Sequence, residues 1–463
     1  MSCAANSTTT VPARADYLIL GNSAAGVTAA EAIRFCDKEG SIVIASPEPY
    51  AVYGRPLISY MIEGKTTRDR MGYKDPDFYE RLNVTTLLGE GFEATAINAD
   101  AHSVTFSGGA VVSYGSCLVA TGSVPFTPPI EGLNDKANIC TFMTLDDANR
   151  AEELAKEAAK RAAEEGRESH AVVIGAGLIG LKAAEAVKHI VDRVTVLELA
   201  ERILPAVLDG DAASMLQKML AERGIECFPG VSANKILGDE YATGAELTNG
   251  ETITCDFIVA AVGVRPNTAF VVESGAEQGR GLICGKDLQT TLPDVYAAGD
   301  VVQVTDVLSG AERPLALWPN AVHQGRIAGM HMAHFPNAIP YMGSFAVNAV
   351  DFFDASLLTS GIINPPADDD SYTVEIQQDE DTYSYAKFVK RDGCLVGYIL
   401  FNRPDNAGIY TAMIENQIPL SEIGEEAFAG APENLAFPDK MRWYRLHPLY
   451  PAAYDQLGRL QSK

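Results

Sequence analysis

The chain has 463 residues, 47 % of them hydrophobic and 21 % charged, a profile typical of a globular protein with roughly two to four domains. Its formal net charge of −25 at pH 7 argues against nucleic acid and against an anionic membrane surface as partners. The sequence shows neither a run of about 18 uncharged apolar residues nor the apolar core of an N-terminal signal peptide, so we expect a cytoplasmic protein without a membrane span.

Residues 15–34 predict the opening of a dinucleotide-binding fold, in which a buried parallel strand turns sharply into an alanine-rich helix. The turn follows the pattern Gly21-x-Ser23-x-x-Gly26, where the two glycines permit a tight turn and close packing of the helix on the strand. A small middle residue lets a pyrophosphate approach the N–H groups at the helix start. Glycine-rich turns also occur for packing alone, so both interpretations stay open here.

A second strand is predicted at 41–45, where a βαβ unit requires one, and Glu48 just beyond it can accept hydrogen bonds from a ribose. The following stretch, YAVYGRPLIS at 51–60, places the permanent charge of Arg55 in an apolar turn. Two explanations are open: a bound cofactor supplies the counter-charge, or the side chain reaches solvent.

Residues 170–202 repeat the dinucleotide pattern more completely. A buried strand leads into Gly175-x-Gly177-x-x-Gly180, a helix follows, and the next strand ends at Glu198. This acid has about the spacing from the glycine loop that a residue binding an adenosine ribose requires. An acid there repels a 2′-phosphate, so NADH is favoured over NADPH. Two such units in one chain predict two dinucleotides, or a dinucleotide and a flavin.

Three further motifs follow strand-like runs, namely Ala120-Thr121-Gly122-Ser123, Gly263-Val264-Arg265-Pro266-Asn267 and Gly299-Asp300. Together with the two glycine loops, this ordered series resembles the two-dinucleotide-binding-domain flavoproteins of the FAD-dependent pyridine nucleotide–disulfide oxidoreductase family. The resemblance covers roughly residues 15–335. It implies an α/β fold with two Rossmann-like domains, for FAD and NAD(H), and a C-terminal α+β interface domain. The domain bounds we expect are 12–136 and 266–336 for the FAD domain, 137–265 for the NAD domain, and 337–463 for the interface domain with its extended tail.

The same resemblance implies which residues contact each cofactor. On the FAD side, the pyrophosphate loop is formed by Gly21, Ser23, Ala24 and Gly26, and Glu48 contacts the adenosine ribose. Arg55, Thr121 and Gly122 lie beside the flavin. Asp300 binds the ribityl chain, and Trp318 lies beside the isoalloxazine. On the NAD(H) side they are Gly175, Gly177, Leu178, Ile179, Gly180, Glu198 and Gly263. For Trp318 the alternative is a large residue of the core.

Family members that reduce disulfides or oxygen carry a redox-active cysteine just after the first βαβ unit. Here Tyr53 stands in that position, and the segment resembles the Y-x-R-P-x-L-S stretch of the rubredoxin, ferredoxin and nitrite reductases, where the arginine lies beside FAD. Without a thiolate there is no mixed disulfide or sulfenate intermediate. The eight cysteines are scattered, form no CxxC pair and have no metal-ligand spacing, so no metal site is predicted.

Two positions depart from the ferredoxin-reductase pattern. Relatives often carry a lysine one residue past the serine of that stretch, and a glutamate two residues past the last glycine of the NAD loop. This chain has Tyr60 and Lys182 there. We therefore expect a lone lysine near the flavin–nicotinamide junction, where a cation favours an anionic reduced flavin. The predicted catalytic residues are Arg55, Lys182 and Trp318.

After residue 336 the pattern changes to antiparallel strands with tight turns such as Arg391-Asp-Gly393. In relatives this region often forms a dimer interface, so a homodimer or a subunit of a larger redox complex is expected. Residues 439–454 are basic and aromatic in an otherwise acidic chain. They either dock a partner protein or pack as a tail onto their own domain.

Three functions remain open. The first is an FAD-dependent NAD(H) oxidoreductase that exchanges electrons with a one-electron protein such as ferredoxin, rubredoxin or an iron–sulfur subunit. The second is an NADH oxidase or small-molecule reductase that uses flavin alone. The third is a flavin-containing interaction protein with negligible turnover, which would bind FAD without being reduced by NADH.

Overall fold

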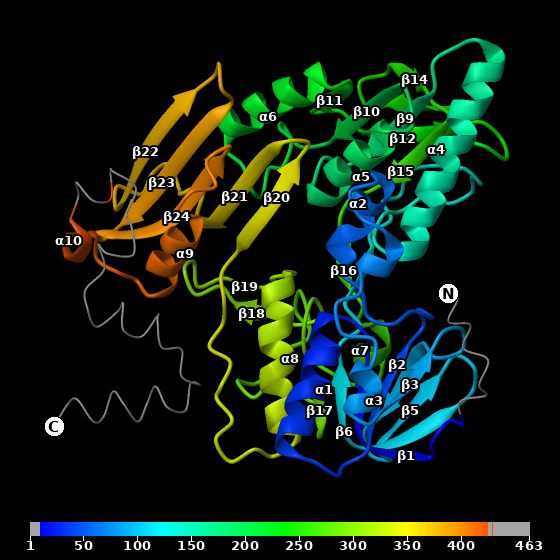
Figure 1. The fold of residues 1–463 in the computed structure, drawn as a ribbon, viewed down its shortest axis with the longest axis vertical. Helices are drawn as coiled ribbons and strands as arrows, with labels where there is room; N and C mark the ends of the chain where they lie inside the picture. The colour runs from blue at the N-terminus through cyan, green and yellow to red at the C-terminus, as the bar shows by residue number, and fades with distance from the viewer. Residues whose placement is uncertain (1–9, 425–427, 429–463) are drawn as a thin grey trace. The chain divides into compact units, whose positions relative to one another are not determined.

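The structure is a computed structural model that describes residues 10–424 and residue 428. The described residues divide into two compact units (Figure 1). Their bounds are Met1–Leu204 with Leu220–Ser344 for the first unit, and Pro205–Met219 with Phe345–Lys463 for the second. The predicted tail at 439–454 lies outside the described residues. In the described part of the chain, no helix is both long and apolar enough to cross a membrane.

The first unit contains a seven-stranded sheet in the order β3-β2-β1-β6-β5-β4, with β17 paired to β6. Strands β1, β2, β3, β6 and β17 run parallel, whereas β4 and β5 form an antiparallel meander. The bounds are β1 (Arg14–Leu20), β2 (Ile42–Ser46), β3 (Val84–Leu88), β4 (Ala94–Asn98), β5 (Ser103–Phe106), β6 (Val111–Val119) and β17 (Val295–Ala297). In proteins with such sheets, ligands bind in the crevice beyond the carboxyl ends of the strands, next to the first strand, where the strand order reverses.

Two helices cover this sheet side by side, α1 (Ala24–Cys36) and α8 (Trp318–Met332) (Figure 1). They approach so closely that a Cβ on Gly325 would lie 2.2 Å from the backbone oxygen of Ala25. Shorter elements of this part are α2 (Ile58–Ile62), α3 (Phe78–Arg81), α7 (Ala269–Glu273) and two 3₁₀ turns, η1 (Arg55–Leu57) and η2 (Arg68–Arg70).

The second sheet of this unit has the order β11-β10-β9-β15-β8 and is parallel throughout. Its strands are β8 (Ile139–Cys140), β9 (His170–Ile174), β10 (Arg193–Glu198), β11 (Ile225–Pro229) and β15 (Phe257–Ala260), and its helices are α4 (Leu145–Glu165) and α5 (Leu178–Lys188). An antiparallel meander of β12 (Ala233–Leu237), β13 (Gly244–Leu247) and β14 (Thr252–Thr254) is added to it, and the pairs β7 (Ser123–Pro125) with β16 (Val264–Pro266) and β18 (Val304–Thr305) with β19 (Glu312–Arg313) complete the unit.

Helix α4 shows how local sequence sets an element. Thr144 and Asp147 form a reciprocal capping box at its start, and Gly166, with φ of 67°, ends it. Between them a helical stripe of alanines and leucines is buried, while the charged residues face solvent. The charged segment from Leu145 is thus a helix with one buried stripe and one solvent-facing side.

The second unit holds an antiparallel sheet in the order β20-β21-β24-β23-β22. Its elements are β20 (Val347–Phe352), β21 (Ala355–Gly361), β22 (Tyr372–Asp379), β23 (Ser384–Arg391), β24 (Cys394–Phe401), α9 (Ala407–Glu415) and α10 (Leu420–Ile423). Asp392 and Gly393 both have positive φ, so the turn predicted there is a two-residue hairpin between β23 and β24. Residues 205–219, which include most of α6 (Gly210–Glu222), group with this unit.

Candidate functional site

The first glycine loop connects β1 to α1. Gly21 has φ of +123°, and a Cβ there would lie 2.0 Å from the backbone oxygen of Ala120. A Cβ on Gly26 would lie 2.0 Å from the oxygen of Gly21. Both glycines are therefore required by packing, whatever the loop binds. Ser23 is the N-cap of α1, and within the described chain no side chain caps that helix start, which leaves its N–H groups for an anion, with Ala24 as the first residue.

The second glycine loop connects β9 to α5 and differs at its middle position. Gly175 and Gly180 are again required, because added Cβ atoms would lie 2.3 Å and 1.9 Å from backbone oxygens. Gly177 has φ of −75° and no described atom within 4 Å of an added Cβ. Neither backbone conformation nor packing demands a glycine there, so its open surroundings fit a ligand at the N-terminus of α5, which begins with Leu178 and Ile179.

Glu198 at the end of β10 is turned toward the same loop. Its Oε2 accepts the N–H of Ala176, at 2.7 Å, and its Oε1 accepts the N–H of Ala200, at 2.8 Å. The acid predicted for the NAD ribose is thus held beside the glycine loop by backbone donors.

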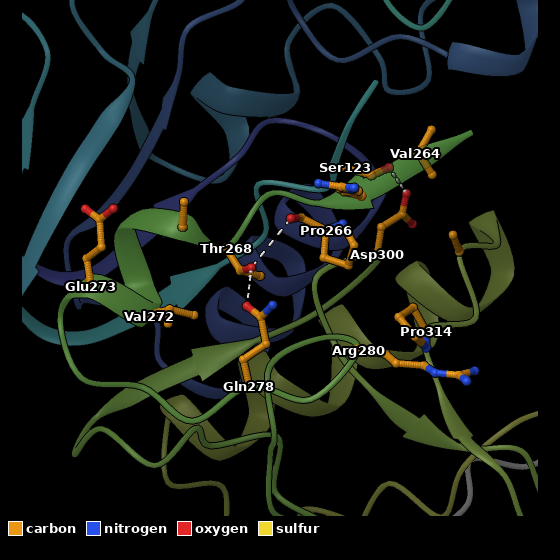
Figure 2. A pocket seen from close by; sticks show the side chains of 13 residues that line it. Ser123, Val264, Pro266, Thr268, Val272, Glu273, Gln278, Arg280, Asp300 and Pro314 are labelled. Carbon is orange, nitrogen blue, oxygen red and sulfur yellow. Dashed lines mark hydrogen bonds between the residues drawn. The ribbon is translucent and has the colours of Figure 1, made fainter. Parts of the chain in front are cut away.

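Several predicted site residues lie where the chain crosses between the two sheets. Thr121 donates its hydroxyl to the Asn267 carbonyl, at 2.8 Å, and the Asn267 N–H donates to the Gly122 carbonyl, at 2.9 Å. Ser123 donates to Asp300 Oδ2, at 2.7 Å (Figure 2). Gly263 has φ of +108° and no described atom within 4 Å of an added Cβ, so the backbone is open to a ligand there too.

A cavity of about 790 Å³ adjoins Asp300 on this crossover, a size within the range of small-molecule sites. Figure 2 shows Thr268 hydrogen-bonded to Gln278 on its wall, with Asp300 and Ser123 at one side. The cavity is lined by Ser123, Val264, Arg265, Pro266, Thr268, Ala269, Val272, Glu273, Gln278, Arg280, Asp300, Pro314 and Ala316. Most of the wall is apolar, and both signs of charge are present on it.

Arg55 has a protein counter-charge that neither sequence explanation anticipated. Its guanidinium forms an ion pair with Glu48 and also donates to the Met143 carbonyl, at 3.3 Å. Tyr53 donates its hydroxyl to Glu48 Oε2, at 2.7 Å, and accepts the N–H of Leu145, at 3.0 Å. Burial lowers the pKa of Arg55, but Glu48 above all raises it, so the net shift is upward and the arginine stays charged.

Asp300 also raises the pKa of Arg55 through its charge, which places the arginine within electrostatic reach of the predicted ribityl acid. The side chain of Arg55 is 35 % exposed, so it lies at the edge of this network. The structure thus brings Glu48, Tyr53 and Arg55 together. Both carboxylate oxygens of Glu48 already accept hydrogen bonds from protein groups. To bind a ribose as predicted, Glu48 would have to accept one more hydrogen bond.

The expectation of a lone lysine at position 182 is wrong. Lys182 Nζ lies 2.6 Å from Glu185 and 3.2 Å from Glu63, and Lys65 Nζ lies 2.7 Å from Glu63 and 3.5 Å from Glu185. Both carboxylate side chains have no exposed area. The lysine ammonium also lies 4.6 Å from the centre of the Tyr60 ring. Each side of this cluster therefore contributes one acid and one lysine: Lys182 and Glu185 lie on α5, and Glu63 and Lys65 follow α2.

Trp318 is the first residue of α8 and is half-buried. Its ring meets that of Tyr73 edge to face, with the centroids 4.8 Å apart, and it packs against the main core from outside. It is thus not a residue of the core interior.

These loops, acids and crossover strands recur in known proteins. A model of the pyridine nucleotide-disulphide oxidoreductase family matches residues 15–325. The chain belongs to this family. Among curated relatives, the NADH-dependent phenylglyoxylate dehydrogenase subunit epsilon of Aromatoleum evansii is 30 % identical over 410 residues, which are 88 % of this chain and 93 % of that subunit. The nitrite reductase [NAD(P)H] of Bacillus subtilis is 30 % identical over 411 residues, and the match spans only 48 % of its length.

Solved structures show the same fold. The reductase chain in the covalent putidaredoxin reductase–putidaredoxin complex superposes with a TM-score of 0.78 at 22 % identity, covering 90 % of this chain and 99 % of that one. The NADH:rubredoxin oxidoreductase of Clostridium acetobutylicum gives a TM-score of 0.70 at 22 % identity, over 90 % and 99 %. The predicted fold class and the resemblance to the family are confirmed.

The chain is thus an FAD-dependent NAD(H) oxidoreductase of the pyridine nucleotide-disulphide oxidoreductase family. Its residues fit those cofactors, because the middle of the second loop and the Gly263 backbone are open where a ligand would lie. Bound flavin supplies the ability to take a hydride from NADH and to pass electrons onward. Within the described residues there is no group of three or more potential metal ligands.

Six of the described cysteines are not prepared for thiol chemistry. Burial raises the pKa of Cys140, Cys227, Cys255 and Cys284 to about 12 each, and it raises the pKa of Cys36 and Cys117 as well. A reactive cysteine needs a lowered pKa, and these six shifts run the other way. Cys3 lies outside the described residues.

Sequence reasoning missed Glu63, Lys65, Glu185 and Ser123 as members of the site. The i,i+3 spacing of Lys182 and Glu185 on one helix is a readable signal for their pair. Ser123 belongs to a motif that was recognised, but its bond to Asp300 joins positions that are far apart in the chain. No local sequence pattern predicts that Glu63 contacts α5.

Proposed function

We propose that this flavoprotein exchanges electrons between NAD(H) and a one-electron protein, such as ferredoxin, rubredoxin or an iron–sulfur subunit, without a redox-active cysteine. The observation that carries the proposal is the hydrogen bonding of Tyr53 to Glu48 and to the Leu145 N–H. By resemblance to the family, Tyr53 is the residue we expect at the position of the redox-active cysteine. Burial chiefly raises the pKa of its phenol, so it stays protonated and is no nucleophile at neutral pH.

The named relatives support a place in a larger redox assembly. The phenylglyoxylate dehydrogenase subunit epsilon is a subunit by name, and so is the assimilatory nitrate reductase electron transfer subunit of Bacillus subtilis, 30 % identical over 386 residues. The match covers 83 % of this chain and 47 % of the second subunit. We infer that this chain serves as the NAD(H)-reactive part of such a system, and that its protein partner sets the direction of electron flow.

The cofactor contacts follow the predicted positions. FAD is held by the first loop, Glu48, Arg55, Thr121, Gly122, Asp300 and Trp318, and NAD(H) by the second loop, Glu198 and Gly263. In this proposal Arg55 and Trp318 line the flavin. Lys182 acts beside it together with Lys65, Glu63 and Glu185, so that a cluster of two cations and two anions, rather than a single cation, faces the junction.

The test is an anaerobic titration of the purified flavoprotein with NADH, followed by addition of oxidised ferredoxin or rubredoxin. We expect stoichiometric bleaching of the flavin band by NADH and its rapid return when a protein acceptor is added. Treatment with a thiol-alkylating reagent should leave both phases unchanged. Loss of either phase on alkylation, or flavin reoxidation by oxygen and not by any protein acceptor, would contradict the proposal.

An NADH oxidase or small-molecule reductase is the second candidate, favoured by the cavity beside Asp300. A relative named NADH oxidase, from Methanocaldococcus jannaschii, is 32 % identical over 325 residues, which are 68 % of this chain and 69 % of that protein. Rapid oxygen consumption by the isolated protein would select this candidate. Absence of any flavin reduction by NADH would instead select the interaction protein without turnover.

A further inference from the structure

The side chain of Asn22, the second residue of the first glycine loop, is held by groups outside that loop. Its Nδ2 donates to the Tyr50 carbonyl, at 3.1 Å, and its Oδ1 accepts the hydroxyl of Tyr79, at 2.8 Å. The Tyr79 oxygen in turn accepts the N–H of Val52, at 3.0 Å. The three hydrogen bonds close a ring, because Tyr50 and Val52 belong to one short segment. We call these four groups the Asn22 ring; all of them lie in the first compact unit.

The hydrogen bonds of the Asn22 ring all run in one direction. A backbone N–H only donates, so the Tyr79 oxygen accepts from Val52 and gives its own proton to Asn22. The amide oxygen of Asn22 therefore faces Tyr79, and its nitrogen is left for the Tyr50 carbonyl. Burial raises the pKa of Tyr79 more than its two hydrogen bonds lower it. The phenol thus stays protonated at neutral pH and remains a donor to Asn22.

The segment that supplies the Tyr50 carbonyl and the Val52 N–H has further contacts of its own. The Val52 carbonyl accepts the N–H of Tyr73, at 3.1 Å, and the N–H of Gly54 donates to the Met71 carbonyl, at 2.8 Å. The side chain of Val52 is buried. The segment is therefore held in place independently of Asn22, and it is a fixed support to which Asn22 attaches the loop.

Tyr79 is also held by more than the Asn22 ring. It lies on α3 next to Phe78, which is fully buried and whose ring centroid lies 5.1 Å from that of Tyr79. Directly after α3, the Leu82 carbonyl accepts the Nε–H of Arg34 on α1, at 2.8 Å. The phenol thus reaches Asn22 from a short helix that is itself bound to α1.

The loop that carries Asn22 is fixed at its two ends by contacts of another kind. The N–H of Gly21 donates to the Ala45 carbonyl, at 2.8 Å, and Gly26 packs against the oxygen of Gly21. Between these ends, the side chain of Ser23 caps no N–H group at the start of α1. Through Asn22, a side chain from outside the loop therefore acts on the part of its backbone that an anion would approach.

We propose that Tyr79 is a positioning residue for FAD, which through Asn22 holds the first glycine loop in the conformation that receives the pyrophosphate. A loop already ordered in its binding conformation loses less conformational freedom when the ligand binds, so breaking the Asn22 ring weakens FAD binding. Tyr79 acts here through Asn22 and not on the cofactor. This inference rests on the proposed contact of the first loop with FAD, and it is independent of the protein acceptor.

The experiment compares the holoenzyme variants Tyr79→Phe and Asn22→Ala, singly and combined, with Tyr114→Phe. Tyr114 is a buried tyrosine on β6 of the same sheet, and its hydroxyl has no hydrogen-bond partner in the described chain, so it is a matched control. Equilibrium dilution of the holoprotein, followed by the fluorescence of released FAD, gives the dissociation constant of FAD. We expect Tyr79→Phe to raise it about tenfold, as for the loss of two hydrogen bonds between neutral groups, and Tyr114→Phe to leave it unchanged.

The combined variant tests the route from Tyr79 to the loop. Because this route runs through Asn22, Tyr79→Phe should have little further effect in the Asn22→Ala background. The affinity of the FAD-saturated variants for NAD⁺ should equal that of the parent protein, and excess FAD should restore the turnover number of Tyr79→Phe. A lower Tm with an unchanged FAD dissociation constant in Tyr79→Phe would overturn the proposal, and so would a full tenfold effect in the Asn22→Ala background. If Tyr79→Phe does not fold, Asn22→Ala decides, and an unchanged FAD affinity there would overturn the proposal.

Ser23→Val in the same series separates this inference from the assignment on which it rests. Loss of FAD from Ser23→Val, with an unchanged dissociation constant in Tyr79→Phe, would reject only the positioning role of Tyr79. Retention of FAD by both variants would reject the contact of the first loop with FAD.

Discussion

The two glycine loops share the positions of their outer glycines but differ in the residue at the middle position. In both loops the first and third glycines abut backbone oxygens about 2 Å from where a Cβ would lie, so packing alone explains them. The middle residue is Ser23 in one loop and the open Gly177 in the other. Packing therefore explains the outer glycines, and the middle position is where we expect a bound ligand to influence the choice of residue.

The acids at the end of the second strand of each unit, Glu198 and Glu48, differ in the kind of group that holds them. Glu198 is held by two backbone N–H groups beside its loop, and no described side chain neutralises it at hydrogen-bonding distance. Glu48 is held by the side chains of Arg55 and Tyr53. The acid predicted for NAD is thus held by backbone groups, whereas the acid predicted for FAD is part of a side-chain network that reaches α4.

The largest effect should come from the outer glycines, and it should be the same in both loops. Gly26→Ala and Gly180→Ala each place a Cβ within about 2 Å of a backbone oxygen, so each should cost roughly 3 kcal/mol or more of unfolding free energy. Chemical denaturation of the two variants measures this. Gly408→Ala, at an open helical glycine, is the control and should not destabilise. A full-stability Gly180→Ala protein would break the argument that packing sets these positions.

Gly177→Val should separate ligand from fold. The position has an ordinary φ and open surroundings, so the variant should fold with an unchanged Tm and normal FAD content. Its affinity for NADH should fall on the order of a hundredfold, because the isopropyl group fills the space a pyrophosphate would occupy. Equilibrium binding of NAD⁺ to the holoprotein checks this, with Gly408→Val as the matched control. Retained affinity would mean that the nucleotide lies elsewhere.

The sequence predicts most of what lies within one strand–turn–helix unit, because there the pattern and the contacts are both local. The β1 and β9 turns, the strand that ends at Glu198 and the hairpin at 392–393 were all readable for that reason. The misses are contacts between distant positions: Glu63 with Lys182, and Asp209 with Lys387. A pairing of that kind depends on how whole elements pack, and no period or spacing in the chain encodes it.

The contrast between the two acids predicts the next effect. Arg55→Met removes the counter-charge of Glu48 and should cost about 2 kcal/mol of unfolding free energy, as expected when a hydrogen bond to a charged group is lost. FAD content should fall with it, whereas NAD⁺ affinity should not. Absorbance at the flavin band per folded protein gives the readout, and Arg70→Met, at an exposed arginine nearby, is the control. Full FAD occupancy in Arg55→Met would remove the arginine from the flavin site.

The smallest effect should come from Ser23→Gly, which converts the first loop into the glycine pattern of the second. Ser23 has an extended backbone, and in the described chain its side chain caps no N–H group. Glycine therefore should cost only about 0.5–1 kcal/mol, through the greater freedom of the unfolded chain, and FAD binding should not change. Ser23→Val is the informative partner, because it should expel FAD as Gly177→Val expels NADH, with little change in the stability of the apoprotein. If Ser23→Val instead retains FAD, the middle position of the first loop does not face the cofactor. The parallel between the loops would then hold for the backbone only.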